Sequence, residues 1–459
     1  MNNIFRQNNL VTKQDRERQF GTKGAVVWLT GLSGSGKSTI AVLAEKMLTD
    51  KGYRCYLLDG DNIRLGLNSD LGFSDADRTE NIRRISHMAA LFAHSGCICF
   101  VSAISPFAKD RETAKKAAKT MDVSFFEIFV DTCVEECIKR DTKGLYKKAI
   151  AGEIKDFTGI SSPYEAPTEP FLRIDTCSCT PEEAARQICN LLSFVQNLET
   201  MCTQICDVSI KAGEEILAVY NSDFAVQTKD DKSPLTQADL RSNKVIVDLL
   251  TSQYPDIAVL SEETKDTGER RQNPFCFVVD PLDGTKEFVK RNGEFTVNIG
   301  LCAYGKPILG VVYAPVTNTL WYAAVGCGAF SQTSDNDTYF DEINRIFVSD
   351  KTNDFTVMAS RSHADERLAK ILDSNKHRIK ETVSAGSSLK GCLIAQGKAD
   401  IYYRTGLTCE WDTCAMHCVV EQAGGVLRQL DHTPLVYNRE NTLNDKGFYI
   451  LNRPENTLE

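Results

Sequence analysis

The sequence predicts an α/β protein of two domains, the first built around a parallel sheet. At 459 residues the chain is longer than a single hydrophobic core usually supports. In its first part, apolar strand-like runs at 25–30, 53–59, 97–104 and 125–130 are separated by helix-like segments. This alternation is typical of a three-layer αβα domain, in which helices cover both faces of a parallel sheet.

Strand-like runs in the second part of the chain follow one another with little between them. A helix-like segment at 237–254 precedes runs at 275–280, 295–304 and 308–314. Consecutive runs of this kind predict neighbouring antiparallel strands in a second, layered α/β domain. The polar tract 331–342 predicts a mobile surface loop.

No linker rich in Pro, Gly or Ser marks the boundary between the domains. The pattern is helical on both sides of Thr200. We therefore place the junction near residue 198, between a domain of residues 1–198 and a domain of residues 199–459.

Composition and charge indicate a soluble protein without a nucleic-acid partner. The formal net charge is −9, which gives no electrostatic reason to expect nucleic-acid binding. The sequence has no run of eighteen apolar residues, and its start lacks the apolar centre of a signal peptide. We expect a cytoplasmic protein with no membrane partner.

The seventeen cysteines include no CxxC pair. Cys133 with Cys137, and Cys202 with Cys206, have the spacing of neighbours on a helix and leave a metal site open. No histidine pattern completes a zinc site, however. We expect reduced thiols that pack as small apolar side chains.

A glycine-rich motif, GLSGSGKST, follows the first predicted strand and precedes a helix. Glycines allow successive backbone N–H groups to turn toward a polyphosphate, Lys37 neutralises its β and γ oxygens, and the Ser38 hydroxyl can hold Mg²⁺. The motif predicts a nucleoside triphosphate site. Its expected ATP-binding residues are Gly31, Ser33, Gly34, Ser35, Gly36, Lys37, Ser38 and Thr39.

Acidic and basic residues follow the next predicted strand, with Asp59 and Asp61 at its end and Arg64, Arg78 and Asn81 close behind. A carboxylate at a strand end opposite a phosphate loop can accept the proton of an acceptor hydroxyl. Taken alone, the segment is equally consistent with capping acids and a solvated arginine face.

The order of motifs in this half of the chain closely resembles the adenylylsulfate kinase family over roughly residues 1–195. The motifs are GLSGSGKST, LDGDNIR, DRTENIRRI, ISP, RDTKGLYKKA and IKDFTGI. The resemblance implies a P-loop domain that binds ATP and adenylylsulfate, uses Mg²⁺ with ATP, and forms a homo-oligomer. Ala108 and Thr142 depart from the usual arginine and proline of the family, at positions that do not touch the transfer chemistry directly.

By this resemblance, Asp61 is the base for the 3′-hydroxyl and Lys37 the catalytic lysine. Paired arginines suit an anionic phosphosulfate, and aromatic rings suit adenine. Some family members carry a phosphorylated serine at the position of Ser105. The implied adenylylsulfate-binding residues are Asp61, Arg64, Phe73, Arg78, Asn81, Ile104, Ser105, Lys143, Gly144, Leu145 and Phe157.

Acidic residues recur in four short clusters of the second half, TQADL, SEE, DPLDGT and EWDT. Carboxylate oxygens on strand ends and turns suit Mg²⁺, and two such ions can bridge a phosphate and generate an attacking hydroxide. Scattered acids are more often simply solvated, so the clusters alone leave both interpretations open.

DPLDGTKEF, EWDT and AGG resemble the magnesium-dependent, lithium-sensitive phosphatase superfamily of the inositol monophosphatases, over about residues 205–455. KSPLTQAD, GEFTVNIG, SRSH and GSSLK are similar to its 3′(2′),5′-bisphosphate nucleotidase branch. This likeness implies a layered αβαβα fold, two or more Mg²⁺ ions, and 3′-phosphoadenosine 5′-phosphate as substrate.

The same resemblance assigns roles to individual residues. Asp239 with Thr285 orients the attacking water. The implied metal ligands are Glu262, Asp280, the Leu282 carbonyl, Asp283 and Asp412. The implied substrate contacts are Gly284, Thr285, Arg361, His363, Ser387, Lys390 and Arg404. Tyr403 stands where this branch often has proline, which predicts an altered adenine pocket.

Three hypotheses for the whole chain follow. The first is an enzyme that adds a 3′-phosphate to adenylylsulfate and removes the 3′-phosphate from 3′-phosphoadenosine 5′-phosphate. The second keeps the kinase and makes the other half an inositol or sugar phosphatase. The third makes one half a non-catalytic nucleotide sensor, although Lys37, Asp61, Asp280, Asp283 and Asp412 are all intact.

Overall fold

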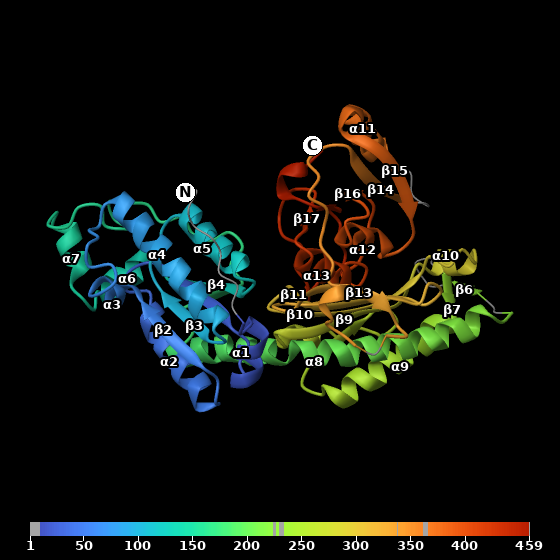
Figure 1. Ribbon diagram of the computed structural model, residues 1–459, viewed down its shortest axis with the longest axis horizontal. Coiled ribbons are helices and arrows are strands. Elements are labelled where there is room, and N and C mark those ends of the chain that lie inside the picture. The colour runs from blue at the N-terminus through green and yellow to red at the C-terminus, as the bar shows by residue number, and fades with distance from the viewer. Residues whose placement is uncertain (1–9, 224–225, 229–233, 337, 361–365, 459) are drawn as a thin grey trace. The chain divides into compact units, whose positions relative to one another are not determined.

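The computed structural model describes residues 10–458 apart from 224–225, 229–233, 337 and 361–365. The chain forms two compact units, Met1–Gln196 and Asn197–Glu459. The division lies inside helix α8, Pro181–Tyr220, a helix of 40 residues (Figure 1). The helical pattern on both sides of Thr200 is therefore one continuous helix, which explains why no linker composition marks the junction.

The N-terminal unit contains a five-stranded sheet in the order β2-β3-β1-β4-β5, and every pair of strands is parallel. Its strands are β1 Ala25–Thr30, β2 Cys55–Asp59, β3 Ile98–Ser102, β4 Ser124–Asp131 and β5 Leu172–Asp175. Its helices before α8 are α1 Lys13–Phe20, α2 Lys37–Asp50, α3 Gly60–Arg64, α4 Asp75–His94, α5 Ala108–Thr120, α6 Val134–Arg140 and α7 Leu145–Ile150. The predicted parallel sheet is confirmed.

Helices cover both faces of this sheet. Apolar side chains of α4 and α5 pack against Val26, Trp28 and Leu58 in one core cluster. On the other side, α2 meets the start of α8, where the Cys189 thiol contacts the Ala44 carbonyl at 3.6 Å. Because all strands run the same way, the segments that follow β1, β2 and β3 lie at one edge of the sheet, where α/β proteins bind ligands.

The C-terminal unit contains two larger sheets. The first has the order β13-β12-β11-β10-β9-β8, antiparallel except for the parallel β8–β9 pair. Its strands are β8 Ala258–Ser261, β9 Phe275–Asp283, β10 Thr296–Ala303, β11 Lys306–Ala314, β12 Thr319–Ala324 and β13 Gly328–Thr333. The antiparallel neighbours predicted from consecutive runs are confirmed as β9, β10 and β11.

The second sheet has the order β15-β14-β16-β18-β17 and mixes parallel and antiparallel pairs. Its strands are β14 Phe355–Ser360, β15 Ile379–Ala385, β16 Ile401–Arg404, β17 Val426–Gln429 and β18 Phe448–Leu451, and a short ribbon pairs β6 Val226–Thr228 with β7 Pro234–Thr236. The remaining helices of the unit are α9 Gln237–Gln253, α10 Thr285–Val289, α11 Glu366–Ser374, α12 Leu389–Ala395 and α13 Cys414–Gln422, with short 3-10 turns η1 Glu269–Gln272, η2 Glu342–Asn344, η3 Lys376–Arg378 and η4 Pro454–Asn456.

These elements stack in five layers, αβαβα, as predicted. Helices α12 and α13 lie between the two sheets, and one core cluster joins both sheets to them (Figure 1). The contact is close, because a Cβ atom on Gly310 of β11 would lie 2.1 Å from the Ala415 carbonyl oxygen of α13. Helices α8 and α9 cover the outer face of the first sheet, and α11 packs on the second through Leu368.

The tract 331–342 differs from the predicted mobile loop. Its first three residues complete β13, and the Phe340 ring packs against Tyr322 at 5.3 Å and Phe330 at 5.0 Å. Polar composition predicted exposure, but aromatic contacts with the sheet anchor this segment. Among the described residues, no helix has both the length and the apolar character needed to cross a bilayer.

Candidate active sites

The phosphate loop lies between β1 and α2 at the carboxyl edge of the parallel sheet. Glycine is required at Gly31, where a Cβ atom would lie 2.4 Å from the Val130 carbonyl oxygen, and at Gly36, whose φ is +103°. Lys37 Nζ donates to the carbonyls of Gly31 at 2.9 Å and Leu32 at 2.7 Å. Burial lowers the pKa of Lys37 to about 8. An anion bound in this loop would offset the free-energy cost of burying the ammonium group by pairing with it.

A carboxylate oxygen of Asp59, at the end of β2, lies beside the phosphate loop. Ser38 Oγ lies 2.7 Å from Asp59 Oδ2 and 3.0 Å from Ser102 Oγ. The other oxygen of Asp59 accepts the N–H groups of Asp61 and Asn62 and so caps α3. Ser38 and Asp59 together offer the hydroxyl and carboxylate oxygens that suit Mg²⁺ beside a triphosphate. Sequence reasoning placed Asp59 at a strand end but missed this pairing, because β3 separates β2 from β1.

The predicted acceptor residues come from helices α3 and α4 and from the loops that carry Phe73, Lys143 and Phe157. Asp61 is exposed and forms an ion pair with Lys143 at the start of α7. The Arg64 guanidinium lies 4.5 Å from the centre of the Phe73 ring. Arg78 donates to Thr158 at 3.3 Å and to Ser162 at 3.4 Å, and so holds the loop of Phe157.

The remaining predicted residues line the same region. The Phe157 ring packs on Tyr146 at 5.0 Å, and the Tyr146 hydroxyl donates to the Ser33 carbonyl at 2.9 Å. This links the loop of Phe157 to the phosphate loop. Gly144, with φ +66°, and Leu145 begin α7, while Asn81 is buried in α4 and accepts a hydrogen bond from Asn68 at 2.9 Å.

Ser105 lies in the core. Only 1% of it is exposed, and its hydroxyl lies 3.0 Å from both Trp28 Nε1 and Thr30 Oγ1. The neighbouring Ile104 carbonyl accepts the Thr30 hydroxyl at 2.7 Å. Phosphorylation of Ser105 therefore stays a prediction, and it requires this hydroxyl to leave its buried contacts.

Three acids of the C-terminal unit form one cluster. Ligand oxygens of Asp280, Asp283 and Asp412 lie within 4.8 Å of one another. Asp280 and Asp283 come from the end of β9, and Asp412 precedes α13, which packs directly on the first sheet. Glu262, just after β8, is not part of this group, but its charge raises the pKa of Asp280 and of Asp412.

The electrostatics of the cluster favour a bound cation. Burial raises the pKa of all three carboxyl groups, and that of Asp412 to about 8, and neighbouring carboxylates add to the rise for Asp280 and Asp412. Buried acids this close repel one another when ionised unless positive charge compensates. The donor set is entirely oxygen, which fits Mg²⁺ and disfavours zinc.

A hydroxyl and a carboxylate stand beside the cluster. Thr285 Oγ1 lies 3.2 Å from Asp239 Oδ1 and 3.3 Å from the Leu282 carbonyl oxygen. The second oxygen of Asp239 accepts the backbone N–H and the hydroxyl of Thr236, both at 2.7 Å, in a capping box that begins α9. The structure therefore brings together Asp239 and Thr285, which are predicted to orient the water, and Leu282, whose carbonyl is a predicted metal ligand.

Positive charge lies on the other side of the acids. Lys390 is buried, donates to the Ser387 carbonyl at 2.7 Å and to the Ala385 carbonyl at 3.2 Å, and its pKa is lowered to about 8 by burial. Its charge lowers the pKa of Asp283, and that of Arg404 lowers the pKa of Asp412.

The other predicted residues of the phosphatase site are Gly284, Arg361, His363 and Tyr403. Gly284 has φ +93° and leads into α10. Arg361 and His363 lie outside the described residues. An adenine pocket altered at Tyr403 stays a prediction. Residues alternate across β16, so Tyr403 packs with Leu458 in the cluster on the opposite face from Arg404.

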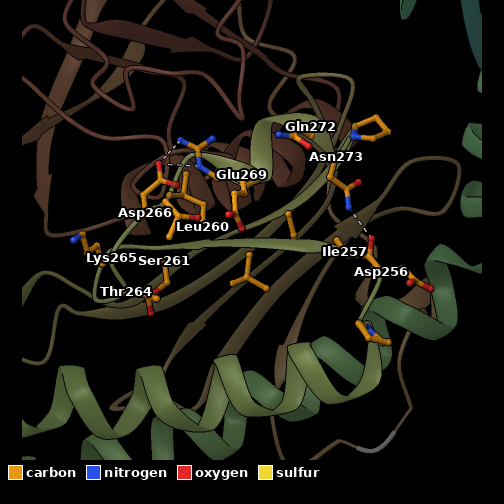
Figure 2. Close-up of a pocket in the computed structure, with 16 residues that line it drawn as sticks. Asp256, Ile257, Leu260, Ser261, Thr264, Lys265, Asp266, Glu269, Gln272 and Asn273 are labelled. Atoms are coloured by element: carbon orange, nitrogen blue, oxygen red, sulfur yellow. Dashed lines mark hydrogen bonds and ion pairs between the residues drawn. The ribbon is translucent and has the colours of Figure 1, made fainter.

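A cavity of about 650 Å³ lies along β8 and is lined by residues 255–261, 264–267, 269–270 and 272–274 (Figure 2). Asp266 and Arg270 form an ion pair of 2.8 Å in its wall, and Asn273 donates to the Asp256 carbonyl at 2.7 Å. None of the three clustered acids lines it. The cavity is therefore distinct from the candidate active site.

Comparison with known proteins agrees with the geometry of each unit. Residues 23–175 match the profile of the family described as Adenylylsulphate kinase, and residues 197–455 match that of the Inositol monophosphatase family. An adenylyl-sulfate kinase of Clostridium acetobutylicum is 52% identical over 190 residues, which are 41% of this chain and 94% of that protein. The chain belongs to both families.

Other relatives match one half at a time. The bifunctional enzyme CysN/CysC of Mycobacterium tuberculosis is 52% identical over 190 residues, which are 41% of this chain but 30% of that protein. The crystal structure of CysQ from Bacteroides thetaiotaomicron matches 56% of this chain and 98% of its own, with 38% identity and a TM-score of 0.49. The kinase CysC of M. tuberculosis, solved with AMPPNP and APS, matches 38% of this chain and 99% of its own, with 52% identity and a TM-score of 0.37.

The protein is thus an enzyme with an adenylylsulfate kinase domain and a phosphatase domain of the inositol monophosphatase family.

In the phosphatase domain, sequence reasoning missed two residues that hold Asp283. Its Oδ2 accepts Asn298 Nδ2 at 3.1 Å and the Ser388 N–H at 2.7 Å. The Ser388 hydroxyl lies 3.0 Å from that oxygen and 3.2 Å from the Asp412 carbonyl oxygen. Ser388 therefore joins the two segments that carry the clustered acids.

Replacing Ser388 by alanine is expected to weaken Mg²⁺ activation of the phosphatase by about 10- to 100-fold, the usual effect of removing a group that orients a metal ligand. The measurement is a Mg²⁺ titration of phosphatase rate for the full chain. Ser252→Ala, an exposed serine of α9, is the matched control. An unchanged Mg²⁺ dependence in Ser388→Ala would show that this hydroxyl does not position the ligands.

Proposed function

We propose that this enzyme phosphorylates the 3′-hydroxyl of adenylylsulfate with ATP and removes the 3′-phosphate of 3′-phosphoadenosine 5′-phosphate. The kinase half is supported by family membership and by the convergence of Asp61, Lys143 and the phosphate loop. The nucleotide specificity of the phosphatase half rests on one observation, the basic pair Lys390 and Arg404 beside the clustered acids.

In the kinase domain, the phosphate loop and Lys37 hold the β and γ phosphates of ATP, and Ser38 with Asp59 would hold Mg²⁺. Arg64 and Arg78 bind the phosphosulfate, and the Phe73 and Phe157 rings contact adenine. Asp61 accepts the proton of the 3′-hydroxyl as that oxygen attacks the γ-phosphorus. Lys143, paired with Asp61, is placed to orient that carboxylate.

In the phosphatase domain, Asp280, Asp283, Asp412, Glu262 and the Leu282 carbonyl would hold Mg²⁺. When bound, the metal lowers the pKa of a water molecule and stabilises charge on the phosphate. The Thr285 hydroxyl donates to Asp239, and its oxygen can accept a hydrogen bond from the attacking water. Asp239 is fixed by its two bonds from Thr236 and so holds the threonine in place.

The basic pair favours a bisphosphorylated nucleotide over inositol 1-phosphate. The clustered acids with their metals serve the phosphate that is cleaved, and the positive charges of Lys390 and Arg404 beside them would attract a second anion. The 5′-phosphate of the nucleotide supplies that anion, whereas inositol 1-phosphate has only one phosphate. Charge-assisted hydrogen bonds to it would be stronger than those to a neutral hydroxyl.

The test compares kcat/KM for 3′-phosphoadenosine 5′-phosphate with that for inositol 1-phosphate on the full chain. Two charge-assisted bonds of ~1.5 kcal/mol each correspond to a preference of about 100-fold for the nucleotide. Lys390→Met should reduce this preference, and Lys398→Met, at an exposed position of the same domain, should not. A preference for inositol 1-phosphate would favour the alternative of a sugar phosphatase.

A further inference from the structure

Two exposed cysteines occupy equivalent positions beyond the ends of neighbouring strands in the kinase domain. Strands β4 and β5 are parallel, and their last pair is Asp131 with Asp175. Cys133 and Cys177 each follow these residues by two positions, and both are exposed. The side chain and backbone of Cys133 lie close enough to Cys177 to shift the pKa of its thiol.

Contact between the two segments continues to the residues just before these cysteines. One residue beyond the sheet, the hydroxyls of Thr132 and Thr176 lie 2.5 Å apart, and the Thr176 N–H donates to the Asp131 carbonyl at 3.1 Å. Neighbouring strands lie about 4.8 Å apart, which is within the Cα separation of about 4.4–6.8 Å that disulfides span. Cys133 and Cys177 directly follow this contact between Thr132 and Thr176, and we expect them to come within disulfide distance without rearrangement of the sheet.

The same two segments support the phosphate loop. Thr132 Oγ1 donates to the Ser35 carbonyl at 3.2 Å. Arg140 reaches that carbonyl at 3.5 Å and also donates to the hydroxyl and the carbonyl of Thr176, at 3.1 Å and 2.9 Å. A change in the spacing of the Cys133 and Cys177 segments is thus transmitted to Ser35 through Thr132 on one side and through Thr176 and Arg140 on the other.

We propose that Cys133 and Cys177 are a reversible disulfide site through which oxidation weakens ATP binding by the kinase domain. The oxidant is a low-molecular-weight disulfide such as oxidised glutathione. The thiolate of one cysteine attacks a sulfur of that disulfide. This step forms a mixed disulfide on the cysteine and releases one thiol of the oxidant. The second cysteine then loses its proton and attacks the first cysteine's sulfur, releasing the second thiol.

The direction of the effect follows from the lengths of the bonds. Sulfur atoms in a disulfide are about 2.05 Å apart, which is shorter than any hydrogen bond between thiols. Bond formation therefore draws the Cys133 and Cys177 segments together and moves Thr132 and Thr176 against the Ser35 carbonyl. The phosphate loop then departs from the geometry that places its N–H groups around a triphosphate.

The experiment treats the full chain with oxidised glutathione and maps disulfides by tryptic digestion and mass spectrometry. Cleavage after Lys119, Lys139, Arg173 and Arg186 gives the peptides 120–139 and 174–186, which carry the two cysteines. We expect these peptides to be joined with the loss of two hydrogens. They should stay joined in Cys179→Ser, and they should separate in Cys133→Ser and in Cys177→Ser.

Activity is measured on the same samples. We expect the KM for ATP to rise at least about threefold on oxidation, the equivalent of ~0.6 kcal/mol, and to return after reduction. Phosphatase activity, measured on the same chain, should not change. Absence of the joined peptides overturns the site, and a joined chain with an unchanged KM for ATP overturns the link to the phosphate loop. A rise in KM that persists in Cys133→Ser would assign the effect to another thiol and also contradict the proposal.

Discussion

Lys37→Ala is expected to lower kinase turnover by a factor on the order of 10²–10³, the usual cost of removing a group that stabilises charge in the transition state. The ammonium group is already buried among the carbonyls of Gly31 and Leu32, so no water shell needs to be removed when the triphosphate binds. The measurement is the rate of ATP-dependent phosphorylation of adenylylsulfate by the full chain.

Two controls accompany this substitution. Lys46→Ala removes an exposed lysine of the same helix α2, which pairs only locally with Asp50, and it should retain kinase activity. Phosphatase activity of Lys37→Ala should remain within a few-fold of the parent because the phosphate loop lies wholly in the N-terminal unit. Loss of both activities in a folded Lys37→Ala chain would contradict two separate active sites.

Asp283→Asn is expected to lower phosphatase turnover by about 100-fold or more, since a ligand lost from a metal site costs at least as much as a group that only orients one. The amide keeps an oxygen that can accept the Ser388 N–H but removes one negative charge from a cluster that must hold dications. Turnover is measured over a range of Mg²⁺ concentrations.

Protein stability distinguishes metal loss from unfolding in this variant. Buried carboxylates repel one another without metal, so Asp283→Asn should melt no lower than the parent in the presence of a chelator. Asp373→Asn, at an exposed position of α11 paired with Lys376, is the control and should keep full phosphatase activity. Full turnover of Asp283→Asn at low Mg²⁺ would show that the clustered acids do not hold the catalytic metal.

Features coded by short stretches of sequence could be predicted. The phosphate loop is nine consecutive residues after a buried strand, and the DPLDGT segment carries two of the three clustered acids within four residues. The parallel sheet followed from the alternation of apolar runs, which are clearest at β1 and β3 because these strands are buried along their whole length. These features depend on local conformation, which neighbouring residues largely determine.

Contacts between distant segments could not be predicted. Ser38 meets Asp59 only because the β2-β3-β1 strand order brings both to Ser102. Nothing in GSSLK distinguishes Ser388, which bonds Asp283, from Ser387, which does not. The face of β16 that Tyr403 occupies could not be predicted either, because the face a residue occupies depends on strand register.

The product formed from 3′-phosphoadenosine 5′-phosphate shows directly whether the phosphatase domain removes the 3′-phosphate of this nucleotide. The full chain is incubated with this nucleotide and Mg²⁺, and the products are separated by nucleotide chromatography. We expect AMP, which keeps its 5′-phosphate, and one equivalent of inorganic phosphate, and no AMP from Asp283→Asn. Adenosine 3′-phosphate as the product, or no hydrolysis by a chain that cleaves inositol 1-phosphate, would contradict it.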